Sequence, residues 1–226
     1  MSISKNKTRA KKPQTSRYTN VKRKLEESIF ALNKTLVDTT KETIDDYVYN
    51  TVDLFAGCGG LTKGFEDAGF RSILGVEIDP DAAATYDANF KDAAVWAGDI
   101  HDLSDQEALE MIRGQDVHVL TGGFPCQGFS VAGDRNPEDE RNQLFKQMVR
   151  FTKLLNPMFV VGENVPGIVT MDDGRFMNEI FNSFNAIGYT ITARVLESAD
   201  FGVPQYRPRT IFIANRVGVA NPYPME

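Results

Sequence analysis

Beyond Tyr47 the sequence alternates short β-rich runs with helical patterns, and this alternation constrains the fold more than any other feature. Parallel strands need crossover connections, which are usually helices, so the alternation is typical of a parallel sheet covered by helices on both faces. We predict the α/β class with a doubly wound, mostly parallel sheet. Strands are expected near residues 51–55, 72–77, 93–97, 117–121, 158–162, 189–196 and 209–214, with crossover helices that include Asp81–Phe90, Gln106–Arg113 and Gln143–Leu155.

Length and composition favour one main domain. A chain of 226 residues with 42% hydrophobic residues buries one good core. No stretch approaches the roughly 20 consecutive apolar residues of a membrane-spanning helix, and the polar start lacks the apolar segment of a secretory signal. The two cysteines, Cys58 and Cys126, give no disulfide framework and are available for chemistry. We expect a soluble protein of a reducing compartment, the cytoplasm, with no membrane partner.

The first 46 residues are predicted to form a region separate from the main domain, which covers residues 47–226. Every charged side chain between Met1 and Lys24 is basic, although the net charge of the chain is −6. Such an arm can neutralise DNA phosphates without reading sequence. A solvated tail is the alternative on composition, and a transit peptide is a weaker third. Apolar residues at steps of three and four from Val21 to Leu36 predict an amphipathic helix.

Three loops at predicted strand ends are suited to a nucleoside-type ligand. The first strand leads into a glycine loop, Ala56-Gly57-Cys58-Gly59-Gly60, which allows a sharp turn and a close approach of the backbone. Glu77 ends the second strand about 20 residues later, where this architecture holds ribose hydroxyls. Asp99 follows the third strand and can accept a hydrogen bond from an adenine amino group.

These loops have a simpler alternative, in which Glu77 and Asp99 cap strand ends and the glycines only turn the chain. The loops contain no Lys-Ser/Thr pair to hold phosphates, and Glu77 would repel a phosphate on the ribose, so an adenosyl ligand with an uncharged tail is favoured over ATP or NADP. Cys58 occupies a small-residue position in the glycine loop, and we expect it to serve packing.

The fourth and fifth strands are followed by residues that carry chemistry. Cys126 lies in Gly123-Phe124-Pro125-Cys126-Gln127-Gly128, a turn that presents its sulfur outward, although a free cysteine is more often a small buried hydrophobe. Glu163 follows the next strand and brings a carboxylate to the same edge of the sheet. Arg207 and Arg209 precede the last strand.

With these residues in place the chain resembles the cytosine-5 DNA methyltransferases, over about Val52 to Asn215. The motifs that carry the resemblance are DLFAGCGG, GFPCQGFS, ENVPG and QYRPR, which occur in the family's order. The resemblance implies a Rossmann-like S-adenosylmethionine-dependent methyltransferase fold, with S-adenosylhomocysteine as the product and no metal. The residues expected to bind this cofactor are Phe55, Gly57, Gly59, Glu77, Ile78, Asp99 and Pro125.

The resemblance also implies a mechanism for double-stranded DNA. Cys126 is expected to add to C6 of a cytosine flipped out of the duplex, because C5 is too weakly nucleophilic to take a methyl group directly. Glu163 is expected to hydrogen-bond N3, one of Arg207 and Arg209 to bind O2, with Arg209 favoured, and the other arginine to order the pocket. Arg141 resembles a phosphate-contacting position in a closing loop, and a solvent-facing arginine is nearly as good an interpretation.

The family's target-reading region is expected after Glu226, since residues 217–226 cannot hold it. We expect a split enzyme of prokaryotic restriction-modification, in which a second polypeptide supplies this region. A truncated chain and a non-catalytic DNA-binding or regulatory subunit are the alternatives, and the cytosine-5 tRNA methyltransferases share the same motifs. The intact set of Cys126, Glu163, Arg207 and Arg209 argues against a purely binding role.

Overall fold

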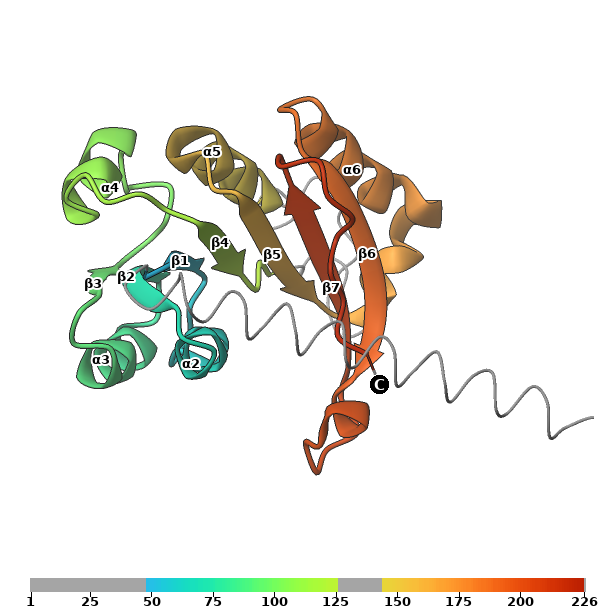
Figure 1. Cartoon of the computed structure of the whole chain (residues 1–226), viewed down its shortest axis with the longest axis horizontal. Coiled ribbons are helices and arrows are strands. Elements are labelled where there is room, and N and C mark those ends of the chain that lie inside the picture. Colours follow the sequence, from blue (N-terminus) through green and yellow to red (C-terminus); the bar gives the residue numbers. More distant parts are fainter. Residues whose placement is uncertain (1–47, 126–143, 226) are drawn as a thin grey trace, which may run out of the picture. The chain divides into compact units, whose positions relative to one another are not determined.

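The computed structural model describes residues 48–125 and 144–225, which form a seven-stranded sheet with helices on its two faces (Figure 1). The strands are β1 Asn50–Leu54, β2 Arg71–Glu77, β3 Ala94–Ala97, β4 Val119–Gly122, β5 Phe159–Asn164, β6 Thr190–Glu197 and β7 Pro208–Asn215. The helices are α2 Gly60–Asp67, α3 Pro80–Asn89, α4 Asp105–Met111, α5 Phe145–Leu155 and α6 Arg175–Asn185, and short 3₁₀ turns are η3 Pro166–Val169, η4 Met171–Gly174 and η5 Ser198–Phe201.

The strand order is β3-β2-β1-β4-β5-β7-β6, and β7 is the one strand of this sheet that runs antiparallel to its neighbours. The connection from β6 to β7, residues 198–207, is shorter than the dozen or so residues of a parallel crossover, so the chain turns back beside β6. The prediction of a doubly wound, mostly parallel sheet is confirmed. The order reverses between β1 and β4, which is where such sheets bind ligands.

Helices α2 and α3 cover one face of the sheet, and α4, α5 and α6 cover the other (Figure 1). The central strand β1 is therefore buried along its whole length, as expected for a parallel strand covered on both faces. Helix α6 lays Phe176, Ile180 and Phe184 against the core at helical spacing. No helix among residues 48–125 and 144–225 has the length and apolar content to cross a membrane.

The predicted strands all coincide with observed ones to within two residues at each end, and the three named crossover helices correspond to α3, α4 and α5. The arm and the amphipathic helix expected within residues 1–46 lie outside the described residues. The division between residues 46 and 47 stays a prediction.

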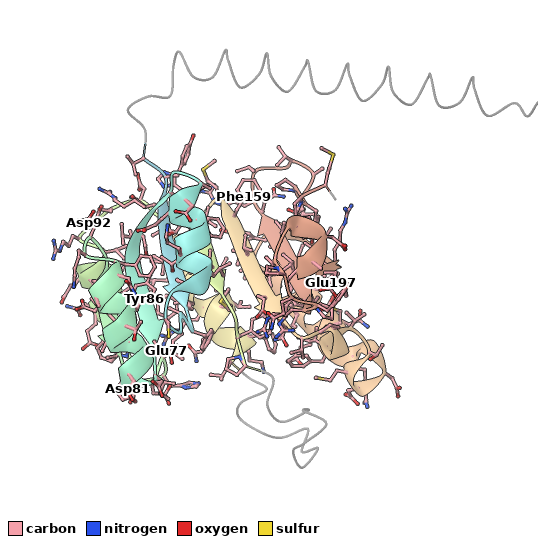
Figure 2. The ribbon with its side chains drawn as sticks, turned by 90° about the horizontal axis from the view of Figure 1, so that it is seen from below. Glu77, Asp81, Tyr86, Asp92, Phe159 and Glu197 are labelled. Carbon is pink, nitrogen blue, oxygen red and sulfur yellow. The ribbon has the colours of Figure 1, made fainter. Side chains whose placement is uncertain are left out.

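A buried polar network joins the first strand to the helices that follow it. The carboxylate of Asp53 accepts hydrogen bonds from the hydroxyls of Thr62 at 2.6 Å and Thr121 at 2.8 Å. The Tyr86 hydroxyl lies 3.1 Å from the Thr62 hydroxyl and 2.8 Å from that of Ser72, and Tyr86 sits between α3 and the sheet (Figure 2). Desolvation raises the pKa of Asp53 to about 6, although the two hydroxyl donors lower it. The network connects β1, β2, β4, α2 and α3.

Candidate cofactor pocket and active site

A pocket of about 350 Å³ opens at the carboxyl ends of β1, β2, β3 and β4. This volume lies within the range of small-molecule sites, and the position is the ligand-binding edge of a doubly wound sheet. Five of the predicted cofactor residues line it together with neighbours that sequence reasoning missed. The lining residues are Phe55, Val76, Glu77, Ile78, Gly98, Asp99, Ile100, His101, Gly123, Pro125 and Leu144.

The glycine loop reaches this pocket through Phe55 and a hydrogen-bonded turn. Phe55 has a φ of 57°, a left-handed conformation that costs a bulky residue roughly 1–3 kcal/mol. The next two residues hold the turn, because the Ala56 N–H donates to the Val76 carbonyl at 3.0 Å and the Gly57 N–H to Glu77 Oε2 at 2.7 Å. Gly57 therefore acts on the pocket through Glu77 and does not line it.

Gly59 serves the packing of α3 instead of the pocket wall. Its φ is 89°, and a Cβ atom there would lie 2.1 Å from the Phe90 ring and 3.0 Å from the Tyr86 ring. The adjacent Cys58 is exposed, so the expectation that Cys58 serves packing is wrong. Only a glycine allows the loop to approach α3 so closely.

Glu77 and Ile78 form the wall contributed by β2. Glu77 Oε1 accepts the Asp79 N–H at 2.8 Å while Oε2 accepts that of Gly57, so backbone donors fix both oxygens at the strand end. A carboxylate oxygen has two lone pairs, which leaves capacity for ligand hydroxyls. Ile78 is 66% exposed although it is apolar, and it offers an apolar contact at the pocket.

Asp99 and His101 form the wall contributed by the loop after β3. The backbone N–H of His101 donates to Asp99 Oδ1 at 2.9 Å, and the imidazole Nδ1 lies 2.8 Å from the same oxygen. These contacts hold the pKa of Asp99 below its ordinary value, the backbone hydrogen bond most of all. The carboxylate is therefore ionised at neutral pH and acts as an acceptor.

Glu163 and Arg209 form an ion pair next to the pocket. Arg209 Nε lies 2.6 Å from Glu163 Oε1, and both side chains are less than one third exposed. Glu163 comes from β5 and Arg209 from the antiparallel neighbour β7, so the pair spans the two strand ends. A Cβ atom at Gly123, a lining residue, would lie 3.2 Å from Glu163 Oε2. The carboxylate therefore faces the β4 side of the pocket.

The backbone before Cys126 is held by Asn164, which sequence reasoning did not place in the site. The buried Asn164 side chain donates to the Phe124 carbonyl at 2.8 Å, and its own oxygen accepts the Val165 N–H. Pro125 lines the pocket immediately before Cys126. Cys126 and Arg141 themselves lie outside the described residues.

Arg207 is placed apart from this pair. It is exposed, its backbone N–H binds the Glu197 carboxylate, and its carbonyl accepts the Ser198 hydroxyl at 2.9 Å. Among the ion pairs of the described residues, the one that involves Glu163 uses Arg209. The structure thus brings together Glu163 and Arg209 of the predicted catalytic residues.

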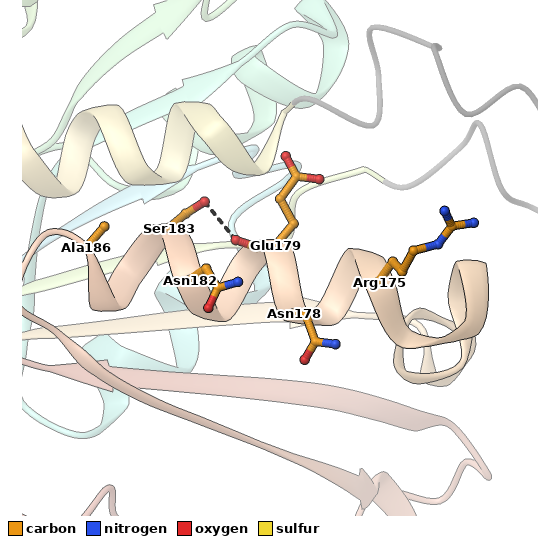
Figure 3. A pocket seen from close by; sticks show the side chains of 6 residues that line it. All are labelled: Arg175, Asn178, Glu179, Asn182, Ser183 and Ala186. Carbon is orange, nitrogen blue, oxygen red and sulfur yellow. Dashed lines mark hydrogen bonds between the residues drawn. The ribbon is translucent and has the colours of Figure 1, made fainter.

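A second depression, about 470 Å³, follows the outer surface of α6 and contains none of the predicted site residues (Figure 3). It is lined by Arg175, Asn178, Glu179, Asn182, Ser183 and Ala186. The side chains that line it come from one helix, and the Ser183 hydroxyl donates a hydrogen bond to the Glu179 carbonyl at 2.7 Å. We assign it no role in the chemistry.

The sheet order and the pocket at its switch point define the class of S-adenosylmethionine-dependent methyltransferase folds. The model of the C-5 cytosine-specific DNA methylase family matches residues 49–225, and the chain belongs to this family. A structure of Dnmt2 methyltransferase from S. pombe, with 21% identity and a TM-score of 0.59 over 77% of this chain and 53% of that one, supports the fold alone.

Two curated relatives are type II methyltransferases. M1.HphI of Haemophilus parahaemolyticus is 46% identical over 170 residues, which cover 74% of this chain and 46% of the relative. M.DdeI of Desulfomicrobium norvegicum is 42% identical over 73% of this chain and 40% of its own length. A crystal structure of a prophage-encoded DNA modification methyltransferase from E. coli has 34% identity and a TM-score of 0.66 over 74% of this chain and 46% of that one. The chain spans about half the length of these proteins.

Proposed function

We propose that the chain carries the catalytic centre of a DNA (cytosine-5-)-methyltransferase that uses S-adenosylmethionine. One observation carries the proposal: an adenosyl-sized pocket and the Glu163–Arg209 pair meet at Gly123, which stands three residues before Cys126 in the sequence. Membership of the C-5 cytosine-specific family supports the reaction. The names of the relatives, type II methyltransferases, support a role in restriction-modification.

The pocket residues fit an adenosyl ligand. Phe55 and Ile78 provide apolar contact for a purine ring, Glu77 provides acceptors for ribose hydroxyls, and Asp99 provides an acceptor for an amino group. Among the described residues that line the pocket there is no lysine or arginine, the side chains that most often bind phosphate groups. When bound there, S-adenosylmethionine supplies an electrophilic methyl group.

Cys126, Glu163 and Arg209 would prepare the cytosine. The Cys126 thiolate forms a bond to C6, and the electron pair of the C5–C6 double bond moves toward N3, where Glu163, once it has taken up a proton from solvent, donates that proton or a hydrogen bond. C5 becomes nucleophilic as a result. After C5 is methylated, water removes the C5 proton and the thiolate leaves, which restores the ring. General-acid assistance of this kind contributes about 10²–10⁴ in rate.

The Glu163–Arg209 ion pair would orient both groups on one ring. Arg209 holds Oε1, so Oε2 is left toward the pocket side, where N3 of a flipped base would lie. The guanidinium has further N–H groups that can donate to the adjacent O2. An arginine beside a glutamate that has taken up a proton matches the O2–N3 edge of cytosine.

The full enzyme is proposed to act on double-stranded DNA in the prokaryotic cytoplasm, together with a second polypeptide that carries the target-reading region. One relative is itself short: the match to M.AquIA of Picosynechococcus, at 35% identity, covers 74% of that protein, against 46% of M1.HphI and 40% of M.DdeI. A relative of this length supports a catalytic chain that is separate from the target-reading region. This part of the proposal is tested by mixing the chain with the product of the neighbouring reading frame. Methylation of DNA by the mixture and by neither part alone is expected.

The reaction is tested in the mixture of the chain with the second polypeptide, using labelled S-adenosylmethionine and duplex DNA, with transfer RNA as a second substrate. We expect Cys126→Ala and Glu163→Gln to lose methyl transfer by at least about 100-fold, while Arg175→Ala on α6 keeps it. Transfer to RNA and not DNA would contradict the proposed substrate. Unchanged transfer by Cys126→Ala would contradict the proposed enzyme.

Duplex DNA with 5-fluorocytosine tests the covalent step, because fluorine at C5 cannot leave as a proton. With S-adenosylmethionine and the second polypeptide present, a stable protein–DNA adduct is expected for the unchanged chain and for Arg175→Ala, and none for Cys126→Ala. An adduct that survives in Cys126→Ala would assign the bond to another nucleophile.

A further inference from the structure

The carboxylate of Asp99 is held through one of its two oxygens. The His101 backbone N–H at 2.9 Å and the His101 Nδ1 at 2.8 Å both contact Oδ1. In the part of the chain that the structure describes, no hydrogen bond reaches Oδ2. Asp99 and His101 both line the pocket, so the carboxylate has one oxygen engaged by protein and one available to a ligand.

The backbone of Asp99 is fixed independently. The indole Nε1 of Trp96 donates to the Asp99 carbonyl at 3.1 Å, and the preceding Gly98 N–H donates to the Glu77 carbonyl at 2.9 Å. With the backbone held, the remaining freedom of Asp99 is rotation of its side chain. Two donors on Oδ1 restrict that rotation. One is the backbone N–H of His101, and the other is its imidazole Nδ1, which is the donor that a substitution at this position removes.

We propose that His101 is a positioning residue that presents Asp99 Oδ2 to the 6-amino group of the adenosyl ligand. This inference rests on the proposed function, because that function supplies the ligand. His101 Nδ1 carries the proton and donates to the Asp99 carboxylate, whose Oδ2 accepts from the exocyclic amine. The imidazole acts through Asp99 and sets preference for adenine among purines.

The exposure of the pair separates this role from a purely structural one. The side chains of His101 and Asp99 are 48% and 44% exposed, and an ion pair or hydrogen bond at such exposure contributes little to folding. A ligand that fills the pocket excludes water from the pair, which strengthens the contacts. Replacement of His101 is therefore expected to leave the melting temperature unchanged and to alter binding.

The test compares S-adenosylhomocysteine with its 6-desamino analogue, which carries purine in place of adenine. The unchanged full chain is expected to bind S-adenosylhomocysteine about 10- to 100-fold more tightly, as for a hydrogen bond to a charged acceptor. His101→Ala is expected to reduce this preference to about 3-fold or less while binding the analogue as before. Calorimetric titration measures both dissociation constants.

Two variants give a matched control, because the amide nitrogen of asparagine occupies the position of imidazole Nδ1 and that of glutamine the position of Nε2. We expect His101→Asn to keep the preference for S-adenosylhomocysteine and His101→Gln to lose it. Asp99→Ala, which removes the acceptor, sets the lower limit of the preference.

Three outcomes would overturn the role of His101 and leave the proposed cofactor standing. These are an unchanged preference for S-adenosylhomocysteine in His101→Ala, an equal loss of affinity for both ligands in that variant, or identical behaviour of His101→Asn and His101→Gln. Failure of the unchanged chain to bind S-adenosylhomocysteine would overturn it together with the proposed cofactor. Binding by the unchanged chain therefore separates the two failures.

Discussion

Asp53 carries a carboxylate into the core, and its position has a consequence for stability. It is 1% exposed, and its pKa is raised to about 6 by burial, against a model-peptide value near 4. The folded state thus binds the proton more tightly than the unfolded state does. The contribution of this group to stability is complete below about pH 4 and is lost as the pH rises through about 6.

Asp53→Asn removes this titration. The unfolding free energy of the variant, measured against that of the unchanged chain, is therefore expected to rise between pH 4 and pH 7. The difference in unfolding free energy should change by on the order of 3 kcal/mol, from about two pKa units at 1.36 kcal/mol each. Asparagine retains an acceptor for one threonine hydroxyl and donates to the other. Urea unfolding at several pH values measures the difference, and parallel stability curves for the two proteins would contradict it.

At the scale of elements, α5 is tied to the loop after β3, which contributes Asp99 and His101 to the pocket. Arg150 Nη2 on α5 donates to the Ile100 carbonyl at 3.1 Å and the Leu103 carbonyl at 2.9 Å. Its guanidinium also lies over the Phe151 ring, 4.8 Å from the centroid. Leu144, directly before α5, lines the pocket itself. The position of α5 and the shape of the pocket are therefore coupled.

Arg150→Met keeps the apolar stem of the side chain and removes both hydrogen bonds, so the loop at Ile100 loses its anchor. Affinity for S-adenosylhomocysteine is expected to fall about 5- to 30-fold, from a loss of roughly 1–2 kcal/mol. Lys153→Met, on the exposed side of the same helix, is the matched control and should bind as the unchanged chain does. Equal affinities of the two variants would show that α5 is not coupled to the pocket.

The sequence predicted those pocket-lining residues that stand at strand ends, because the end of a parallel strand has a fixed place at the sheet edge. Phe55, Glu77 and Asp99 were found in this way and line the pocket. His101 was missed because its contact with Asp99 depends on how the chain turns after β3. Gly59 lies away from the pocket because α3 packs its rings against the loop, a tertiary contact that a glycine motif does not specify.

The fold was also predictable in part from the sequence. Alternating strands and helices specify the doubly wound sheet, while the reversal of β7 follows from the short connection after β6. The ion pair of Glu163 with Arg209 needed that reversal, since it places the start of β7 beside the end of β5. A pattern of strands without their directions therefore predicts that the two motifs lie in the same region, but it does not predict that Arg209 pairs with Glu163.

At the scale of the whole molecule the charge is divided unevenly along the chain. The net charge is −6, yet all charged residues between Met1 and Lys24 are basic, so the remainder is strongly acidic. An acidic catalytic region repels the phosphate backbone at long range. Binding of DNA by this chain therefore requires local positive charge, and the arm is the densest source of it in the sequence.

Removal of residues 1–24 is expected to weaken non-specific DNA binding and to flatten its salt dependence. Each phosphate contact contributes about −0.9 to the slope of log K against log salt, so loss of several contacts reduces the slope by several units. Fluorescence anisotropy with a labelled duplex over a series of KCl concentrations measures the slope. An arm of equal length with serine in place of each lysine and arginine separates charge from length and should behave as the deletion does. Both variants should bind S-adenosylhomocysteine unchanged, and a salt slope equal to that of the intact chain would show that the arm makes no phosphate contacts.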